Sequence, residues 1–321
     1  MRHRLAHVTS TVETDAPAIL TGRSPRSIRG IYIANLVAQA AIVVTGAIVR
    51  ITESGLGCPT WPECVDGSIA PTADQSESWH KYIEFGNRTL TFVLTALAIA
   101  AVVAAIIDAR RRRRSGLPSR GVLTMLALVP ILGTVAQAVL GGITVLTGLH
   151  PATVAAHFLV SMAIIAGVVA LVVRSGDSGD RPITWVAPRP VVVLAWLLVA
   201  TSAAVVLLGV IVTGSGPHSG DDTAERLAID PRTIAWLHAD VVLLFIGLLI
   251  GLLVALSVLP VPAVARRRAW ILLAIALAQG ALGYTQYFTG LPELLVGLHV
   301  LGAVLLWIAT LFIPSALRTR G

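Results

Sequence analysis

Residues 137–149 read QAVLGGITVLTGL, and the same pattern returns 142 positions later as QGALGYTQYFTGL at residues 279–291. At this single offset Gln137 falls on Gln279, and beyond the quoted stretch His157 falls on His299. Matches of glycine and leucine are common between apolar segments, but shared glutamine, threonine and histidine positions are not. A repeat of this length indicates two related structural units in tandem.

The composition places both units in a lipid bilayer. Hydrophobic residues make up 55% of the 321 residues, charged residues only 13%, and the mean hydropathy is +0.82. A membrane-spanning helix needs roughly 20 apolar residues. Eight runs meet this length, near residues 31–50, 82–107, 122–144, 152–173, 190–212, 233–257, 270–289 and 293–313. We therefore predict an all-α polytopic membrane protein.

The first two helices of each predicted unit also match, although less tightly. GAIVRITESG at residues 46–55 resembles GVIVTGSG at residues 209–216 after a two-residue gap, and Asn87 falls on His238. We therefore expect two tandem, pseudo-symmetric four-helix bundles. The predicted segments are a tail at 1–28, a first unit at 29–174, a linker at 175–189, a second unit at 190–314 and a tail at 315–321.

Arginine distribution predicts the orientation of the chain. The clusters are Arg110 to Arg114 with Arg120, Arg174 with Arg181 and Arg189, Arg266 to Arg268, and Arg318 with Arg320. All of them fall on one side if both termini are cytoplasmic, as the positive-inside rule requires. The net charge of +7 is then a topology signal, and we expect no nucleic-acid partner.

Three histidines and one asparagine share one predicted depth. His157, His238, His299 and Asn87 each lie six or seven residues inside the outer end of a helix. At about 1.5 Å per residue, this is on the order of 10 Å below the outer surface. A lone intramembrane histidine is more often a hydrogen-bonded core residue, but the repeat makes a shared role the better interpretation.

Imidazole binds iron readily, and helix bundles hold planar porphyrins between facing helices. We interpret His238 and His299 as the two axial ligands of one heme. A zinc site would need more ligands at that depth, and the sequence offers none. The first unit has His157 but only Asn87 opposite, so a porphyrin there would have one strong axial ligand, which suits a substrate.

Glu84 lies three residues before Asn87, so both share one helix face. Two interpretations remain open for this carboxylate. It could pair with Arg88, four residues later, and anchor the helix near the membrane surface. It could instead project into a porphyrin pocket and relay a proton.

Both cysteines, Cys58 and Cys64, lie in GLGCPTWPEC at residues 55–64, within the large outer loop 51–80. On the oxidising side of a membrane, two cysteines six positions apart can close a small disulfide. Free thiols are the alternative, and metal binding by two ligands alone is less favourable.

These stretches resemble the heme A synthases, a family with eight helices in two similar halves. The matching segments spread over residues 46–302 and are GAIVRITESGLGCPTWPEC, YIEFGNR, QAVLGGITVLTGLHP, AAHFL, VTGSGPHSGDD, WLHAD and GLHVLGA. The resemblance implies oxidation of a ring methyl of heme O, through successive hydroxylations, to the formyl group of heme A for terminal cytochrome oxidase. With Lys81 as the only lysine, which suits a high-GC bacterial genome, we expect an actinobacterial-like member in the bacterial cell membrane.

The resemblance also implies residue roles. His238 and His299 would hold a heme b cofactor in the second unit, with both heme sites in the outer half of the bilayer. His157 would bind the iron of the substrate heme O. Glu84 would be the acidic residue near the reacting methyl.

The loop cysteines match the family's outer-loop pair, which implies a Cys58–Cys64 disulfide. One departure concerns the family's commoner pattern of glutamate, two residues and histidine, because EFGN places Asn87 at the histidine position. We therefore expect His157 to be the sole protein ligand of the substrate iron, with Asn87 contacting a water or distal ligand.

Further partners follow from the resemblance: heme O synthase, a protoheme farnesyltransferase, as the upstream enzyme, and a membrane quinone as electron acceptor. The principal rival is a di-heme b-type cytochrome for quinone-linked electron transfer, which would require two histidines for each heme and no Glu84. A repeat-built transporter would place its polar residues nearer the bilayer midplane.

Other polar residues near the outer boundary are weaker candidates. Arg50 and Arg88 could contact heme propionates, although snorkelling to the interface explains them equally well. We expect His80, His150 and His218 to be interfacial or solvated. Residues interpreted as helix-packing positions are Gln137, Gln279, Gly141, Gly142 and Gly283.

Overall fold

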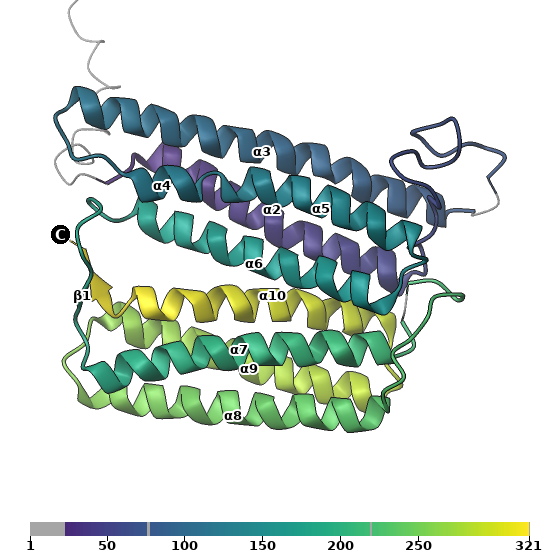
Figure 1. The fold of residues 1–321 in the computed structure, drawn as a ribbon. Coiled ribbons are helices and arrows are strands. Elements are labelled where there is room, and N and C mark those ends of the chain that lie inside the picture. The colour runs from purple at the N-terminus through teal and green to yellow at the C-terminus, as the bar shows by residue number, and fades with distance from the viewer. Residues whose placement is uncertain (1–22, 76–77, 219, 321) are drawn as a thin grey trace, which may run out of the picture.

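The computed structural model describes residues 23–75, 78–218 and 220–320. Long helices lie side by side in two groups (Figure 1), with α2 to α6 in one group and α7 to α10 in the other. The elements are α2 (Arg26–Ile51), α3 (His80–Arg114), α4 (Gly121–Leu126), α5 (Val129–Leu146), α6 (Pro151–Ser175), β1 (Thr184–Trp185), α7 (Arg189–Ser215), α8 (Pro231–Val258), α9 (Ala263–Phe288), α10 (Glu293–Ser315) and β2 (Arg318–Thr319).

Within the described residues, eight helical segments are long and apolar enough to cross a membrane, with α4 and α5 together forming one of them. The prediction of an all-α polytopic membrane protein is confirmed. The first helix begins at Arg26, inside the segment predicted as a tail, and most of that predicted tail lies outside the described residues.

The third span is interrupted, where the sequence predicted one helix over residues 122–144. α4 ends at Leu126 and α5 begins at Val129, with Pro130 in its first turn. Proline lacks an N–H and clashes with the preceding turn, so a helix does not pass through it undisturbed. In the first turn of a new helix it is tolerated.

The second span continues beyond its predicted end at residue 107, through the arginine cluster to Arg114. Arginine is a good helix former, and positive charge at a helix C-terminus interacts favourably with the helix dipole. Arg112 is buried there and donates to the backbone carbonyls of Pro118, at 2.9 Å, and Ser178, at 3.1 Å. The extension therefore packs against the loops at this end of the bundle.

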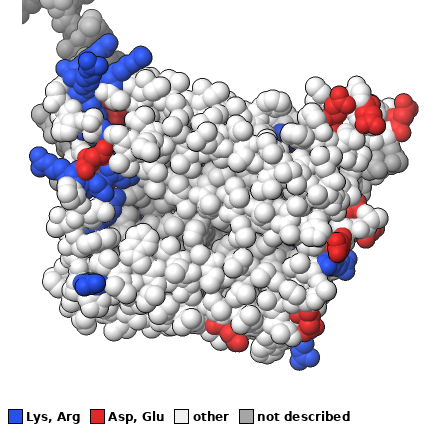
Figure 2. All heavy atoms as spheres, viewed as in Figure 1, with Lys and Arg blue, Asp and Glu red and all other residues white. Residues whose placement is uncertain are grey.

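Charge separates along the helix axes. Figure 2 shows Lys and Arg gathered at the end where the C-terminus lies, while Asp and Glu are prominent at the opposite end. At the arginine-rich end, Arg120 lies 3.6 Å from Asp108 and donates to Ser24 at 2.9 Å. Burial, the largest influence on Arg120, lowers the pKa of its guanidinium. This asymmetry accords with the predicted orientation, which stays a prediction.

A short β-ribbon ties the linker between the groups to the C-terminal tail. Thr184 pairs with Thr319, and Trp185 with Arg318, in antiparallel register. The guanidinium of Arg318 also lies 3.1 Å from the carboxylate of Asp177. The sequence analysis did not predict this pairing.

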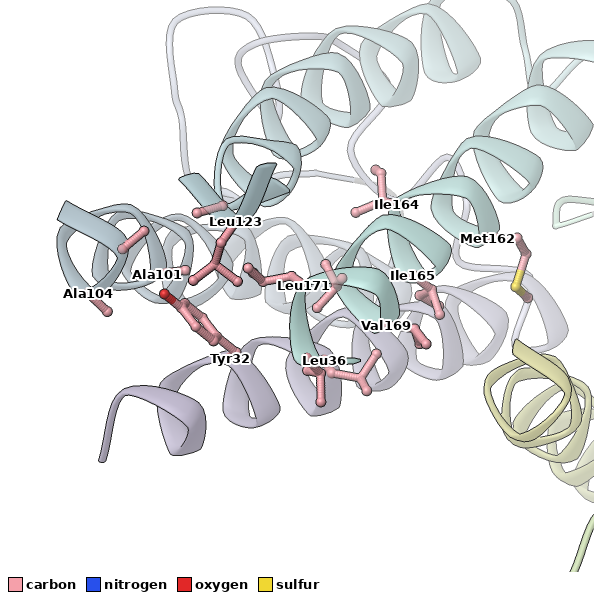
Figure 3. Close-up of a cluster of buried hydrophobic side chains, with 14 of the residues drawn as sticks. Tyr32, Leu36, Ala101, Ala104, Leu123, Met162, Ile164, Ile165, Val169 and Leu171 are labelled. Atoms are coloured by element: carbon pink, nitrogen blue, oxygen red, sulfur yellow. The ribbon is translucent and has the colours of Figure 1, made fainter. Parts of the chain in front are cut away.

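The first helix group has a closely packed core (Figure 3). Tyr32 and Leu36 of α2 are buried in the same cluster as Ala101 of α3 and Ile165 of α6. Small side chains such as Ala101 let membrane helices approach closely. Trp307 of α10 joins this core and donates from Nε1 to the Met162 carbonyl at 3.0 Å, which links the two groups.

Candidate functional site

Three histidines occupy equivalent places in three pairs of consecutive helices. Each ring lies against a glycine of the preceding helix, so closely that a Cβ on the glycine would meet the ring atom Cε1. The pairs, with this distance, are Gly141 and His157 (3.2 Å), Gly209 and His238 (3.3 Å), and Gly283 and His299 (3.2 Å). Each glycine thus makes room for an imidazole, and Gly209 is a site residue that the sequence analysis missed.

The helices bearing these rings lie on opposite corners of their groups. In the second group, α7 and α9 each pack against both α8 and α10, so α8 and α10 are diagonal to one another. In the first group, α2 and α5 each pack against both α3 and α6. His238 and His299 therefore lie on diagonal helices of the second group. Asn87 and His157 lie on diagonal helices of the first group.

The chemistry of the second pair fits axial ligation of a heme. Both rings are half-buried, and Nδ1 of His238 and of His299 is buried without a hydrogen-bond partner in the described structure. Leaving a buried polar atom unpaired costs about 1–3 kcal/mol. Because Nδ1 of each ring lies 3.7–3.8 Å from where the Cβ of the facing glycine would be, Nε2 is the ring atom that would bind an iron placed between the two helices.

A multi-ligand metal ion fits less well. Among the residues that the structure describes, no three His, Cys, Asp or Glu side chains form a group suited to holding one. The expectation that the histidines do not form a zinc site stays a prediction.

The fourth helix pair differs from the other three. Asn87 of α3 accepts a hydrogen bond at Oδ1 from the hydroxyl of Thr45 on α2, at 2.7 Å. Gly46, the repeat counterpart of Gly209, has no atom within 4 Å of where its Cβ would lie. The first group therefore presents one imidazole, that of His157, and an amide held to α2.

Glu84 is buried in the first turns of α3, with only 5% of its surface exposed. Its Oε2 accepts from the backbone N–H of Cys58 at 2.6 Å, and its Oε1 accepts from Nε and Nη2 of Arg88 at 3.0 and 2.5 Å. Hydrogen bonds to charged groups are the stronger kind. The ion pair that the sequence analysis considered is present, and a proton-relay role for Glu84 stays a prediction.

Arg88 holds the outer loop as well as Glu84. Its Nη2 donates to the Cys58 carbonyl at 2.6 Å, and its Nη1 donates to the carbonyls of Thr60 and Glu63 at 3.0 and 3.2 Å. These contacts occupy all three guanidinium nitrogens. They favour a structural role over contact with a propionate, which stays a prediction.

The predicted disulfide between Cys58 and Cys64 is present, and both cysteines are fully buried. Trp61 of the same loop lies against α5, where a Cβ on Gly142 would be 2.5 Å from the indole ring. Gly142 directly follows Gly141, which contacts the ring of His157. The disulfide loop therefore covers the end of the first group that lies opposite the arginine-rich end, beside its histidine.

Lys81 also anchors this loop through hydrogen bonds. Only 5% of the surface of Lys81 is exposed. Its ammonium group donates to the carbonyls of Thr72 and Gln75 at 2.8 and 3.2 Å. The side chain of Gln75 donates in turn to the Gly57 carbonyl at 2.6 Å. A structural role for Lys81 was not predicted, because a lysine near a membrane surface also occurs as an ordinary interfacial residue.

Arg50 joins the two helix groups at their outer ends. Its Nε donates to the His218 carbonyl at 2.7 Å, and its Nη2 donates to the Thr213 carbonyl at 2.8 Å. The ring of His218 is half-buried and hydrogen-bonded to the Leu291 carbonyl at 2.9 Å. His218 is thus packed between segments rather than freely solvated. The propionate contact considered for Arg50 stays a prediction.

The two other histidines of the described residues, His150 and His80, lie at helix starts. His150 is exposed and caps α6 by accepting from the backbone N–H of Ala152 at 3.3 Å. His80 is half-buried, stacks on Trp79, and lies 3.2 Å from the hydroxyl of Ser54. Neither ring is among the nearest neighbours of a helix glycine, unlike the rings of the three histidines above.

Gln137 fastens α5 to the helix that carries His157. Its Nε2 donates to the His157 carbonyl at 2.9 Å and to the Ser161 hydroxyl at 2.6 Å. Its repeat counterpart, Gln279, lies against Gly302 of α10. Both glutamines therefore occupy the packing positions expected from the sequence.

Comparison with known proteins relates most of the chain to one family. The model of the COX15-CtaA family, described as "Cytochrome oxidase assembly protein", matches residues 29–311. The heme A synthase of Geobacillus kaustophilus is 31% identical over 138 residues, which cover 43% of this chain and 38% of the relative. The heme A synthase of Listeria welshimeri is 29% identical over 140 residues, covering 43% and 42%. The matched region spans about two fifths of these relatives.

Proposed function

Because this chain belongs to the COX15-CtaA family of cytochrome oxidase assembly proteins, we propose that it is a heme A synthase, which oxidises a ring methyl of heme O to the formyl group of heme A. The observation that carries the proposal is the inequality of the two helix groups. One group has two diagonal histidines, whereas the other combines a single histidine with a buried, loop-covered carboxylate.

The second group is the resident cofactor site in this proposal. His238 and His299 would hold heme b, which supplies one-electron transfer when bound. Gly209 and Gly283 leave room for the two rings, because a Cβ at either position would lie 3.3 or 3.2 Å from the ring atom Cε1. A membrane acceptor such as a quinone would be the final oxidant in this proposal.

The first group is the substrate site. His157 would bind the iron of heme O, and its ring is set by contact with Gly141 on α5. The hydrogen bond from Gln137 to the His157 carbonyl fixes the backbone that carries this ring. The disulfide loop, with Trp61 against α5, would cover the outer end of the site.

Glu84 would hold or take a proton at its carboxylate oxygens as the methyl is oxidised through successive hydroxylations. The N–H of Cys58 and the guanidinium of Arg88 fix the carboxylate in one orientation and stabilise its charged form. A positioned acid or base of this kind contributes typically 10²–10⁴-fold to a rate.

The surroundings of the site follow from the same proposal. The protein would lie in a bacterial cell membrane with both heme sites in the outer half of the bilayer. Heme O would arrive from heme O synthase, the protoheme farnesyltransferase, and Arg50 is the remaining candidate for a propionate contact near the outer ends of the helices.

The test is to produce the protein in a cell that makes heme O but lacks its own heme A synthase, and to identify extracted hemes by chromatography and mass spectrometry. Heme A, together with a hydroxylated form of heme O, is the expected result. Extracts in which heme O stays unmodified while the purified protein carries heme B alone would support the di-heme cytochrome instead.

A further inference from the structure

We propose that Thr45 of α2 is a positioning residue that turns the Asn87 amide N–H toward an axial face of the substrate iron that no protein side chain ligates. The free face would take a single small ligand, such as water or a diatomic gas. This inference rests on the proposed function, because it concerns the site of the substrate heme.

The four helix pairs share a local sequence pattern with one exception. In the three pairs that carry a histidine, leucine precedes the glycine against which the ring packs. These dipeptides are Leu140-Gly141, Leu208-Gly209 and Leu282-Gly283. In the fourth pair the dipeptide is Thr45-Gly46 and the facing residue is Asn87. The threonine and the asparagine therefore occur together, at the one place where the imidazole is missing.

The contact between these two residues gives a reason for their joint occurrence. The Thr45 hydroxyl lies 2.7 Å from Asn87 Oδ1 and 3.1 Å from the Ile42 carbonyl. A hydroxyl has one proton to donate, and the shorter contact goes to the amide. Leucine at this place, as in the other pairs, would offer no donor. Thr45 thus fixes which end of the amide faces α2.

The opposite end of the amide is then available to a ligand. No hydrogen bond to Asn87 Nδ2 is formed within the described part of the chain, and the residue is only half-buried. Asn87 lies on α3, diagonal to the helix that bears His157. An amide N–H at that corner can donate to a small ligand on the face of the iron remote from His157, whereas an amide is a poor ligand for iron itself.

The backbone at Gly46 nonetheless leaves space for a second imidazole. A Cβ on Gly46 would have no neighbour within 4 Å, while the three counterpart glycines meet a ring at 3.2–3.3 Å. The second imidazole is therefore missing because residue 87 is asparagine, and not because the backbone leaves no space for a ring. The substitution Asn87→His should seat a ring against Gly46.

Carbon monoxide is the probe for the open face, used on the purified full-length protein with its hemes reduced. The unchanged protein should bind carbon monoxide at the substrate heme, because an iron with one protein ligand has a free position. Asn87→His should abolish most of this binding and add a low-spin signal in electron paramagnetic resonance of the oxidised protein. Adding Gly46→Ala to Asn87→His should weaken the new ligation. Carbon monoxide binding that is equal in the unchanged and Asn87→His proteins would overturn the proposal.

The role of Thr45 has its own spectroscopic readout. Thr45→Val removes the hydroxyl at nearly constant volume, so the amide loses its fixed orientation and the carbon monoxide stretching frequency should shift or broaden. Thr45→Ser should restore the original band. Thr89→Val is the matched control, because Thr89 is exposed on α3 and its hydroxyl bonds only its own helix at Phe85. An identical band in Thr45→Val and the unchanged protein would contradict the assignment.

These readouts separate the inference from the proposed function. Protein that forms heme A but binds carbon monoxide regardless of Asn87→His would retain the function and overturn the inference. Protein that fails to form heme A, yet loses carbon monoxide binding on Asn87→His, would overturn the function and retain the one-sided iron site.

Discussion

Glu84 is held by an N–H from one segment and a guanidinium from its own helix, which leaves its carboxylate both buried and fixed. Burial of a charge without such partners would be costly. The partners explain how a carboxylate is kept at the head of a membrane helix. They also mean that the Glu84–Arg88 ion pair and a chemical role for Glu84 are compatible.

Glu84→Gln tests the chemical role at nearly constant size. The amide can still accept from Cys58 but neither carries the charge nor exchanges a proton, so formation of heme A should fall by about 10²–10⁴-fold. Heme content of the purified protein should stay close to normal. Glu225→Gln, at an exposed outer-loop position, is the control. Heme A formation unchanged by Glu84→Gln would leave the carboxylate a purely structural role.

At the scale of elements, the outer loop is fastened to the start of α3 by side chains of that helix. Arg88 holds the disulfide segment, and Lys81 holds the part of the loop near Thr72. The sequence indicated the disulfide through cysteine spacing and side of the membrane. It did not indicate the fastening, because lysine and arginine near a membrane surface also occur as ordinary interfacial residues.

Removing Lys81 should loosen the loop without touching the helices. Lys81→Met keeps the aliphatic stem but leaves the Thr72 and Gln75 carbonyls without their donor, which costs about 1–3 kcal/mol for buried groups. Limited proteolysis should then cut within residues 51–80 faster than in the unchanged protein. Arg110→Met, an exposed position at the other end of α3, should not change this rate.

Disulfide removal should weaken the same element more broadly. Cys58→Ser combined with Cys64→Ser removes a cross-link of the kind that contributes typically about 2–4 kcal/mol. Its effect on Glu84 should appear as reduced heme A formation, together with a lower unfolding temperature in detergent. Full activity and an unchanged unfolding temperature would show that Arg88 and Lys81 alone hold the loop.

The pairing of α5 with α6 makes a further prediction at this scale. Gly141→Ala would place a methyl group 3.2 Å from the His157 ring and force the ring to move. Substrate heme bound per protein should fall, as measured by extraction and chromatography. Gly247→Ala on α8 is the control, because a Cβ there has no neighbour within 4 Å. Equal heme occupancy in both variants would contradict the proposed seating of His157.

For the whole molecule, hydropathy was sufficient to predict the eight spans found in the described residues, because spans depend on periodicity along the chain. The shared depth of the histidines stays a prediction. The diagonal placement of α8 and α10 was not predictable from that periodicity, since it depends on which helices become neighbours. The same holds for the pairing of β1 with β2. The break before Pro130 was visible in principle, but a long apolar run concealed it.

The contact between glycine and histidine was only partly predictable. Gly141 and Gly283 were expected to be packing residues, and the structure adds that each sets an imidazole in place. Gly209 completes the set, and Gly46 is its counterpart beside Asn87. The difference between the two helix groups was first indicated by Asn87. In the structure it involves several residues, on α2 and α3.

The central claim is that one helix group holds the cofactor heme and the other holds the substrate heme. The heme types bound to purified variants test it most directly. His157→Ala should retain heme B and lose heme O and heme A, whereas His299→Ala should lose heme B. Chromatography of hemes extracted from each variant, with mass spectrometry, gives the answer. Loss of the same heme in both variants would contradict the assignment of one group to cofactor and the other to substrate.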